Sequence, residues 1–474
     1  MTAIGSGAGP LTGLPPLDGR LLLDAPARSR AADDFGHLVS RRPLAVLVPG
    51  SVRDVQVLLR HCRGHGLPVA ARGQGHATHG QAQVAGGVVV DMSALREVRV
   101  REGAVVAQAG ARWSDVLRET LPRGLTPPVL TDYLELSVGG TLSAGGIGGA
   151  TGHHGSQADN VLELEVVTGT GEHVVCSPAR GSDLFRAVLA GLGQCAVIVG
   201  ATMRLLPAPA TVRRYRLRYP TAPALMAGQR RAARDGRFDS LQGQIQPSPD
   251  GSGGWCQVLE AVAFHRGSVP PDDAALLADL GDLGSAGGGV VRGGGGRGGE
   301  TGTREIADLS YAAFLDRLAP SVAELTAAGE WSRPHPWWNV FLPDPEADAF
   351  VSAVLADLTP ADLGTGGVIL LYPFRRPPVR VPLLRVPAGR LAFLFALLRT
   401  ASADATDPAA MIEANRGLYR RAGALGGTRY PVGSVPMSRS GWRRHFGPAW
   451  PAFAAAKRRY DPGGILAPGQ RIFT

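Results

Sequence analysis

The sequence predicts an α+β protein built from two lobes, and three observations support this. Its 474 residues exceed the length of one ordinary domain. Short apolar strands alternate with helical stretches from residue 1 to residue 207. Prolines at Pro207 and Pro209 then interrupt the pattern, and a new strand-like run begins at Val212. Such an interruption indicates a boundary between two lobes.

The elements of the first lobe follow from apolar periodicity. Residues 51–65 are expected to form a helix, because Ser51 is a suitable N-cap and Val55, Leu58 and Leu59 supply one apolar face. The other expected elements are strands over 67–70, 86–91, 105–109 and 162–168 and a helix over 183–192.

The middle region, from residue 208 to about 435, is expected to mix strands and helices around a glycine-rich interruption. Within this interruption, Gly284–Gly299, residues 294–299 match the dinucleotide-binding pattern GxGxxG. The match lacks a strand before it and a helix after it, and most of its residues are glycine. We therefore expect a flexible loop there and no dinucleotide site.

Composition indicates a globular protein and argues against nucleic-acid binding. Apolar residues make up 44% of the chain and charged residues 19%, which suits an ample core. The net charge is +9, but Lys457 is the sole lysine and the arginines are scattered. No zinc-finger or RNA-binding motif accompanies them, so a nucleic-acid partner is not expected.

The cysteines, the N-terminus and the hydropathy pattern lead us to expect a cytoplasmic protein. Four cysteines are widely spaced, which favours reduced thiols over disulfides or a metal site. No secretory signal and no apolar stretch long enough to span a membrane are seen. The neighbours His153 and His154 lack carboxylate partners, so no metal site is predicted.

A glycine-rich loop carrying a histidine follows the strand at 67–70. Gly73, Gly75 and His76 stand in it, before the strand at 86–91. Glycines allow backbone N–H groups to close on an anionic group without an intervening side chain. An imidazole in such a loop suggests a cofactor that is both held and tethered, although a glycine-rich turn with a surface histidine is the alternative.

A second segment and the C-terminal tail complete the set of motifs. Residues 131–147 combine Asp132 with glycines and small hydroxyl side chains, which suit close packing against a pyrophosphate. A turn or cap role for Asp132 is the alternative. The tail is strongly patterned from Trp442 to Phe473.

These segments resemble FAD-linked oxidoreductases of the vanillyl-alcohol-oxidase type, and most of all the cytokinin dehydrogenase family. The similarity runs from about Leu17 to Phe473. It implies a two-lobed flavoprotein with a discontinuous PCMH-type FAD-binding domain, formed by residues 1–207 and 436–474. An antiparallel-sheet substrate-binding domain, residues 208–435, would be inserted between these two parts.

The resemblance implies FAD as the cofactor, bonded covalently to His76. Residues 137–149 contain no cysteine, so attachment through one histidine alone is expected. Ala77 stands where the family usually has serine. The further FAD contacts implied are Ala71, Gly73, Gln74, Gly75, Ala77, Gln81, Asp132, Ser137, Ser143, Ile147, Ile198, Tyr430 and Gln470.

The resemblance also implies catalytic roles for Asp132 at the substrate amine and for Glu260 at the purine nitrogens. Trp337, Asn339 and Tyr372 would complete the substrate site. The residues themselves leave alternatives open. Glu260 could be a solvent-facing carboxylate on its strand, and residues 335–339 could be a core aromatic cluster.

The implied reaction is FAD-dependent oxidation of the secondary amine in the side chain of an N6-substituted adenine, such as isopentenyladenine. The imine product would hydrolyse to adenine and an aldehyde, and oxygen or a quinone would reoxidise the flavin. Arg375 and Arg376 depart from the family pattern. They favour the alternative of a flavin oxidase of the same fold that acts on an alcohol, a sugar or a natural-product intermediate. A flavin-binding module without turnover is a further alternative, which Asp132 argues against.

Overall fold

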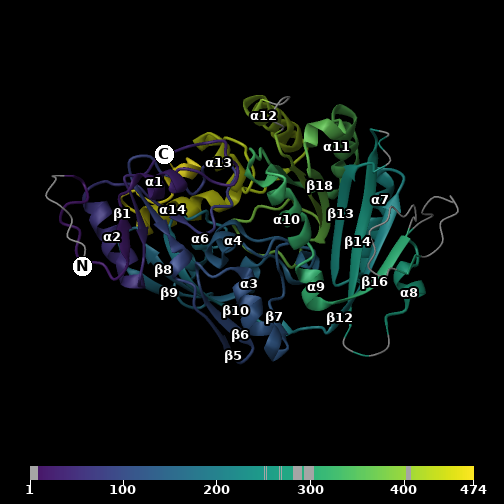
Figure 1. The fold of residues 1–474 in the computed structure, drawn as a ribbon, viewed down its shortest axis with the longest axis horizontal. Helices are drawn as coiled ribbons and strands as arrows, with labels where there is room; N and C mark the ends of the chain where they lie inside the picture. Colours follow the sequence, from purple (N-terminus) through teal and green to yellow (C-terminus); the bar gives the residue numbers. More distant parts are fainter. Residues whose placement is uncertain are drawn as a thin grey trace.

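The structure is a computed structural model that describes residues 9–473 except 250, 252, 266, 268–269, 281–290, 293–303 and 402–406. Its strands form two sheets of an N-terminal lobe and a large sheet made by the middle of the chain (Figure 1). The short strands β7 (Leu125–Thr126) and β11 (Leu206–Pro207) pair as a further two-stranded sheet. The loop predicted at Gly284–Gly299 lies outside the described residues, apart from a short strand at its centre.

The first sheet of the N-terminal lobe presents the glycine-rich loop. Its strands, in spatial order, are β1 (Arg20–Leu22), β2 (Ala45–Val48), β4 (Val88–Asp91) and β3 (Val69–Arg72). Strands β2, β3 and β4 are parallel. Apart from Arg72 and Asp91 at the ends of β3 and β4, their residues are apolar, and most are buried, as expected for a sheet covered on both faces. The loop that carries His76 leaves the end of β3.

The second sheet is antiparallel and meets the segment at 131–147. Its strands are β5 (Val98–Arg101), β6 (Ala104–Gln108), β10 (Ala196–Arg204), β8 (Val161–Thr168) and β9 (His173–Cys176). The helices of the lobe are α1 (Ala25–Ala31), α2 (Val52–Gly64), α3 (Trp113–Thr120), α4 (Val138–Ala144), α5 (Thr151–His154) and α6 (Ser182–Val188). Backbone bonds from Val138 to Ala111 and from Gly139 to Ala109 fix the start of α4 against the end of β6.

The middle of the chain forms one nine-stranded sheet. In spatial order it contains β15 (Val291–Arg292), β16 (Arg304–Ser310), β12 (Thr211–Tyr219), β14 (Trp255–His265), β13 (Ser240–Pro247), β18 (Val368–Arg375), β19 (Leu391–Leu398), β17 (Trp338–Pro343) and β20 (Thr428–Arg429). All pairs are antiparallel except β15 with β16. Its helices are α7 (Ala222–Asp235), α8 (Asp273–Leu277), α9 (Tyr311–Leu315), α10 (Ala319–Ala327), α11 (Asp344–Asp357) and α12 (Pro408–Ala424).

Alternation along the strands gives this sheet two different faces. Helices α7, α11 and α12 cover an apolar face. That face buries Tyr215, Leu217, Leu241, Ile245, Leu259, Trp338, Val340, Ile369, Leu371, Phe393 and Phe395. The residues between them in sequence, including Arg216, Gln242, Glu260, Asn339 and Tyr372, belong to the opposite face, toward the N-terminal lobe.

The C-terminal tail returns to the N-terminal lobe, where helices α13 (Arg439–Phe446) and α14 (Trp450–Tyr460) lie (Figure 1). Val69 of β3 donates to Ile465 and accepts from Ala467, both at 2.8 Å. The Lys457 ammonium is buried and donates to the Asp461 carboxylate at 2.7 Å and to the Gln194 carbonyl at 2.9 Å. The tail therefore forms part of the N-terminal lobe.

The α+β class and the large antiparallel sheet are confirmed, and one predicted helix is too long. The helix expected over 183–192 ends at Val188, because Ala190 and Leu192 adopt left-handed conformations that a helix cannot contain. Ser51 occupies the N-cap position of α2 without a side-chain bond to the helix. The boundaries after residues 207 and 435 stay a prediction.

Candidate active site

A cavity of about 1150 Å³ lies between the N-terminal lobe and the polar face of the nine-stranded sheet. Every residue that the sequence put forward for FAD or substrate lines this one cavity. They are Ala71, Gly73, Gln74, Gly75, His76, Ala77, Gln81, Asp132, Ser137, Ser143, Ile147, Ile198, Glu260, Trp337, Asn339, Tyr372, Tyr430 and Gln470. Segments separated by up to 400 positions thus meet at one place, while the roles of the residues stay predictions.

A buried carboxylate that sequence reasoning missed, that of Asp34, anchors the loop after β3 at Gly80. Asp34 accepts the N–H of Gly80 at 2.6 Å and that of Gly36 at 3.1 Å. Burial raises the pKa of Asp34 to about 6, although these N–H groups oppose the shift. Within the described residues, the N–H groups of residues 74–77 donate to no other group of the chain, so they are available to a ligand.

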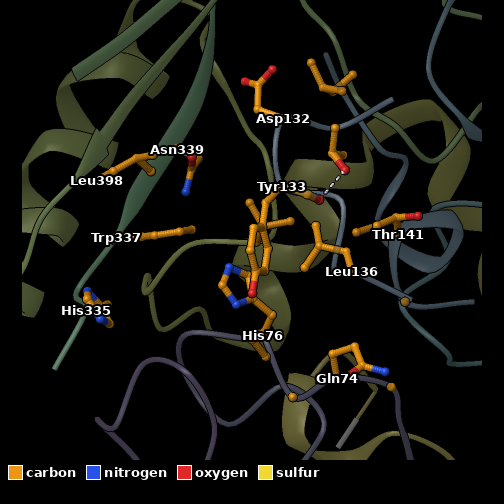
Figure 2. Close-up of a pocket in the computed structure, with 18 of the residues that line it drawn as sticks. Gln74, His76, Asp132, Tyr133, Leu136, Thr141, His335, Trp337, Asn339 and Leu398 are labelled. Carbon is orange, nitrogen blue, oxygen red and sulfur yellow. Dashed lines mark hydrogen bonds between the residues drawn. The ribbon is translucent and has the colours of Figure 1, made fainter. Parts of the chain in front are cut away.

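The His76 imidazole is fixed by aromatic neighbours. Phe35 stacks on it at 4.1 Å between centroids, with Tyr133 at 5.0 Å and Trp337 at 5.6 Å. Figure 2 shows His76, Tyr133 and Trp337 close together in the pocket. Burial, followed by the neighbouring His335, lowers the pKa of His76 from 6.5 to about 3. The ring is therefore neutral at pH 7 and keeps a nitrogen lone pair.

The two glycine-bearing segments meet so closely that a side chain would not fit. A Cβ on Gly73 would lie 1.9 Å from the Ser137 Oγ, and one on Gly140 would lie 2.9 Å from the same atom. Gly75 has a φ of +71°, which favours glycine. The free N–H groups and this bare backbone suit a cofactor that carries a pyrophosphate. The residues present therefore fit FAD.

Asp132 is anchored at the other end of the cavity by three side chains. Its Oδ1 accepts from Arg317 Nη2 at 2.6 Å and from Gln242 Nε2 at 2.7 Å. Its Oδ2 accepts from the Tyr372 hydroxyl at 2.5 Å. Burial and then Asp132 itself raise the pKa of Tyr372 well above its usual value, so Tyr372 is protonated and donates. The alternative of a turn or cap role for Asp132 has no support in these contacts.

Arg317 joins the two predicted catalytic carboxylates and was missed from sequence. Its Nε donates to Glu260 at 3.1 Å, while its Nη2 reaches Asp132. Burial would lower the pKa of Arg317, but Asp132 and Glu260 raise it overall. Only 9% of the Glu260 side chain is exposed, and it is paired with Arg317, so the alternative of a solvent-facing glutamate is wrong.

The two tryptophans at 337–338 divide between cavity and core. Trp338 is fully buried in the helix-covered face of the sheet, against Phe350 and Phe395. Trp337 and Asn339 lie on the other side of the chain and line the cavity, because neighbouring strand residues point to opposite faces. The Asn339 Nδ2 is buried and has no hydrogen-bond partner in the described part of the chain. An orphaned donor of this kind is an expected feature of a ligand site.

Arg375 and Arg376 do not line the cavity. The Arg375 guanidinium instead donates to the Gly152 carbonyl at 3.2 Å and contacts His153. The departure of these arginines from the family pattern therefore does not reach the pocket wall. Among the described residues, no group of three or more His, Cys, Asp or Glu could hold a metal ion, and no helix there has the length and hydropathy to cross a membrane.

Comparisons with known proteins identify the family to which the chain is related. A family model of an FAD binding domain matches residues 43–177, and one described as cytokinin dehydrogenase 1, FAD and cytokinin binding, matches residues 300–473. The chain is 42% identical to an uncharacterised oxidoreductase, ORF5 of the fasciation locus of Rhodococcoides fascians, over 93% of this chain and 96% of that protein. It is 37% identical to cytokinin dehydrogenase 1 of Oryza sativa subsp. japonica, over 100% of this chain and 97% of the rice protein. Cytokinin dehydrogenase 7 of the same plant is 36% identical over 96% of this chain and 91% of its own length.

Proposed function

The chain belongs to the cytokinin dehydrogenase family of FAD-dependent oxidoreductases, and on that premise we propose that it oxidises the N6-side-chain amine of cytokinins. The observation that carries the proposal is the anchored Asp132 carboxylate, which faces the same cavity as His76. The amine would become an imine, and water would then convert the imine to adenine and an aldehyde.

The chemistry that bound FAD would supply is acceptance of the hydride that leaves the carbon next to the amine nitrogen. The protein must take up the proton that the nitrogen loses, and we assign this to Asp132. A carboxylate has about four acceptor positions, and Arg317, Gln242 and Tyr372 occupy three of those on Asp132. One position is left for the amine N–H. The three fixed donors hold that position still, which is what proton transfer in a bound complex requires.

The rest of the cavity would recognise the flat ring of the substrate. Trp337 offers an aromatic wall, and the orphaned Nδ2 of Asn339 offers a donor for a ring nitrogen. Glu260, held by Arg317, offers an acceptor for a ring N–H. Figure 2 shows Asp132, Asn339 and Trp337 around the same space.

We further propose that His76 bonds covalently to FAD. A neutral imidazole has the lone pair that such a bond needs, and the Phe35 stack holds the ring in one orientation. If the bond forms, acid precipitation of the holoenzyme leaves the yellow colour in the protein pellet. His76→Ala should release the colour to the supernatant, and a pellet that stayed yellow would refute the attachment.

Product analysis tests the reaction directly. Purified holoenzyme, isopentenyladenine and an artificial electron acceptor should yield adenine and an aldehyde in equal amounts. A flavin oxidase of alcohols or sugars is the remaining alternative. Arg375 and Arg376, the departures that favoured this alternative, do not line the cavity. Oxidation of alcohols without oxidation of isopentenyladenine would establish it. The same assay with oxygen or a quinone would identify the acceptor.

A further inference from the structure

A row of polar side chains crosses the nine-stranded sheet from the Asp132 end of the cavity. Gln242 of β13, which bonds to Asp132, lies directly opposite Glu260 of β14. Glu260 in turn lies opposite Arg216 of β12, and Arg216 opposite Glu305 of β16. Neighbouring strands are about 4.8 Å apart, so Arg216 stands about 10 Å across the sheet from Gln242.

The two ends of this row carry opposite charge. At the Asp132 end, Asp132 and Glu260 share one guanidinium, that of Arg317. One negative charge is therefore in excess there.

At the far end, two guanidinium groups share one carboxylate. Arg214 lies 2.7 Å from Glu305, and Arg216 lies 3.4 Å from it. One positive charge is therefore in excess, and both arginines line the cavity. Two further carboxylates line the cavity from residues 319–332: Glu330 is paired with Arg333 at 3.1 Å, and Glu324 is exposed on α10.

The arginine end retains unused hydrogen-bonding capacity. The Arg214 Nε is buried and has no acceptor in the part of the chain that the structure describes. The Arg214 side chain is 20% exposed and that of Arg216 is 37% exposed, so a ligand can reach both. Gln244 and Gln246 of β13 line the same cavity and can bond to hydroxyl groups.

We propose that the preferred substrate carries a phosphate at the end remote from its amine, as in an N6-alkyl adenosine 5′-phosphate. This inference rests on the proposed oxidation at Asp132. With the amine at Asp132, the adenine ring lies along the row, and the phosphate reaches Arg214 and Arg216. In the nucleotide the ribose replaces the ring N–H that a free base offers to Glu260, and a ribose hydroxyl donates to Glu260 instead. Guanidinium groups bind phosphate through paired, charge-assisted hydrogen bonds. The phosphate takes no part in the reaction and serves only for binding.

The test compares turnover of N6-isopentenyladenosine 5′-monophosphate with turnover of isopentenyladenine by the holoenzyme. We expect kcat/KM to be higher for the nucleotide by about tenfold or more. In the double variant Arg214→Gln, Arg216→Gln the ratio of the two kcat/KM values should fall by a similar factor. Arg214→Lys, Arg216→Lys, which keeps the charge, should retain most of the preference. Arg218→Gln is the matched control, because Arg218 is exposed on the same strand and does not line the cavity.

Equal kcat/KM values for the two substrates would overturn the inference and leave the proposed function intact. If neither compound is oxidised, the proposed function fails, and calorimetry with adenosine 5′-monophosphate still decides whether the phosphate site exists. The wild-type holoenzyme should bind this nucleotide at least about tenfold more tightly than the double glutamine variant. Equal affinity in both proteins would overturn the inference.

Discussion

Replacing Arg317 by leucine should be among the most damaging changes in the cavity. Only 13% of the Arg317 side chain is exposed, and it faces Asp132 and Glu260, which are 20% and 9% exposed. The change would leave two carboxylates close together without their shared counter-charge. Removing one partner of a buried ion pair costs about 3–5 kcal/mol, and we expect a loss of this size in the free energy of unfolding.

A double-mutant cycle separates this electrostatic effect from lost packing. In the wild-type background, Glu260→Gln should cost about 1–2 kcal/mol, because it weakens a charge-assisted hydrogen bond to Arg317. In the Arg317→Leu background, the same change removes an uncompensated charge and should be neutral or stabilising.

Urea unfolding of the holoenzymes, followed by tryptophan fluorescence, measures all four proteins of the cycle. Arg99→Leu is the control, since Arg99 and Glu97 form an exposed pair with side chains 70% and 64% accessible, and it should cost less than about 1 kcal/mol. An equal cost of Glu260→Gln in both backgrounds would refute the reasoning.

Three further predictions concern the pH dependence of stability, the loop that carries His76 and the C-terminal tail. Burial, then Arg429 and Arg385, lowers the pKa of His445 from 6.5 to about 3. The unfolded chain therefore binds the extra proton, and the free energy of unfolding falls as the pH drops from 6.5 toward 3. His445→Phe should reduce the loss of this free energy between pH 8 and pH 5 by about 2 kcal/mol. An unchanged loss in urea titrations would count against this prediction. In Gly36→Ala the new Cβ would meet the Thr78 carbonyl oxygen at 2.1 Å. This should displace the loop that carries His76 and lower the covalent flavin content of the protein. The control is Gly64→Ala, in α2 with nothing near its Cβ, which should keep the flavin and raise the free energy of unfolding by about 0.5–1 kcal/mol. Lys457→Met leaves the fully buried Asp461 carboxylate unpaired and should cost about 3–5 kcal/mol in thermal or urea unfolding; a cost below 1 kcal/mol would contradict it.

Sequence patterns pointed to the parts of the cavity wall that lie on short motifs. The loop around His76 and the segment around Asp132 each stand out within a few residues, and both line the cavity, while their chemical roles stay predictions. The C-terminal tail was expected in the same domain as the N-terminal part of the chain, and in the structure Leu466 forms a bridge with Val69. Alternation then explains why Trp337 faces the cavity and Trp338 the core.

The contacts that set the electrostatics could not be predicted in this way. Arg317 lies 185 positions from Asp132, and only the packing of α9 and its following turn against the sheet brings it there. Asp34 and Phe35 precede the loop that carries His76 by about forty residues and belong to no motif of their own. The early end of α6 depends on left-handed backbone at Ala190 and Leu192, which apolar periodicity does not reveal.

Anaerobic rapid mixing with isopentenyladenine, followed at the visible flavin band, tests the central claim most directly. The wild-type holoenzyme should bleach, because the substrate amine is oxidised in the cavity that Asp132 and His76 share. The Asp132→Asn holoenzyme should bleach about 10²- to 10⁴-fold more slowly, since a general base contributes about that factor. A wild-type spectrum that stays yellow, or an Asp132→Asn protein that bleaches as fast as the wild type, would contradict the account.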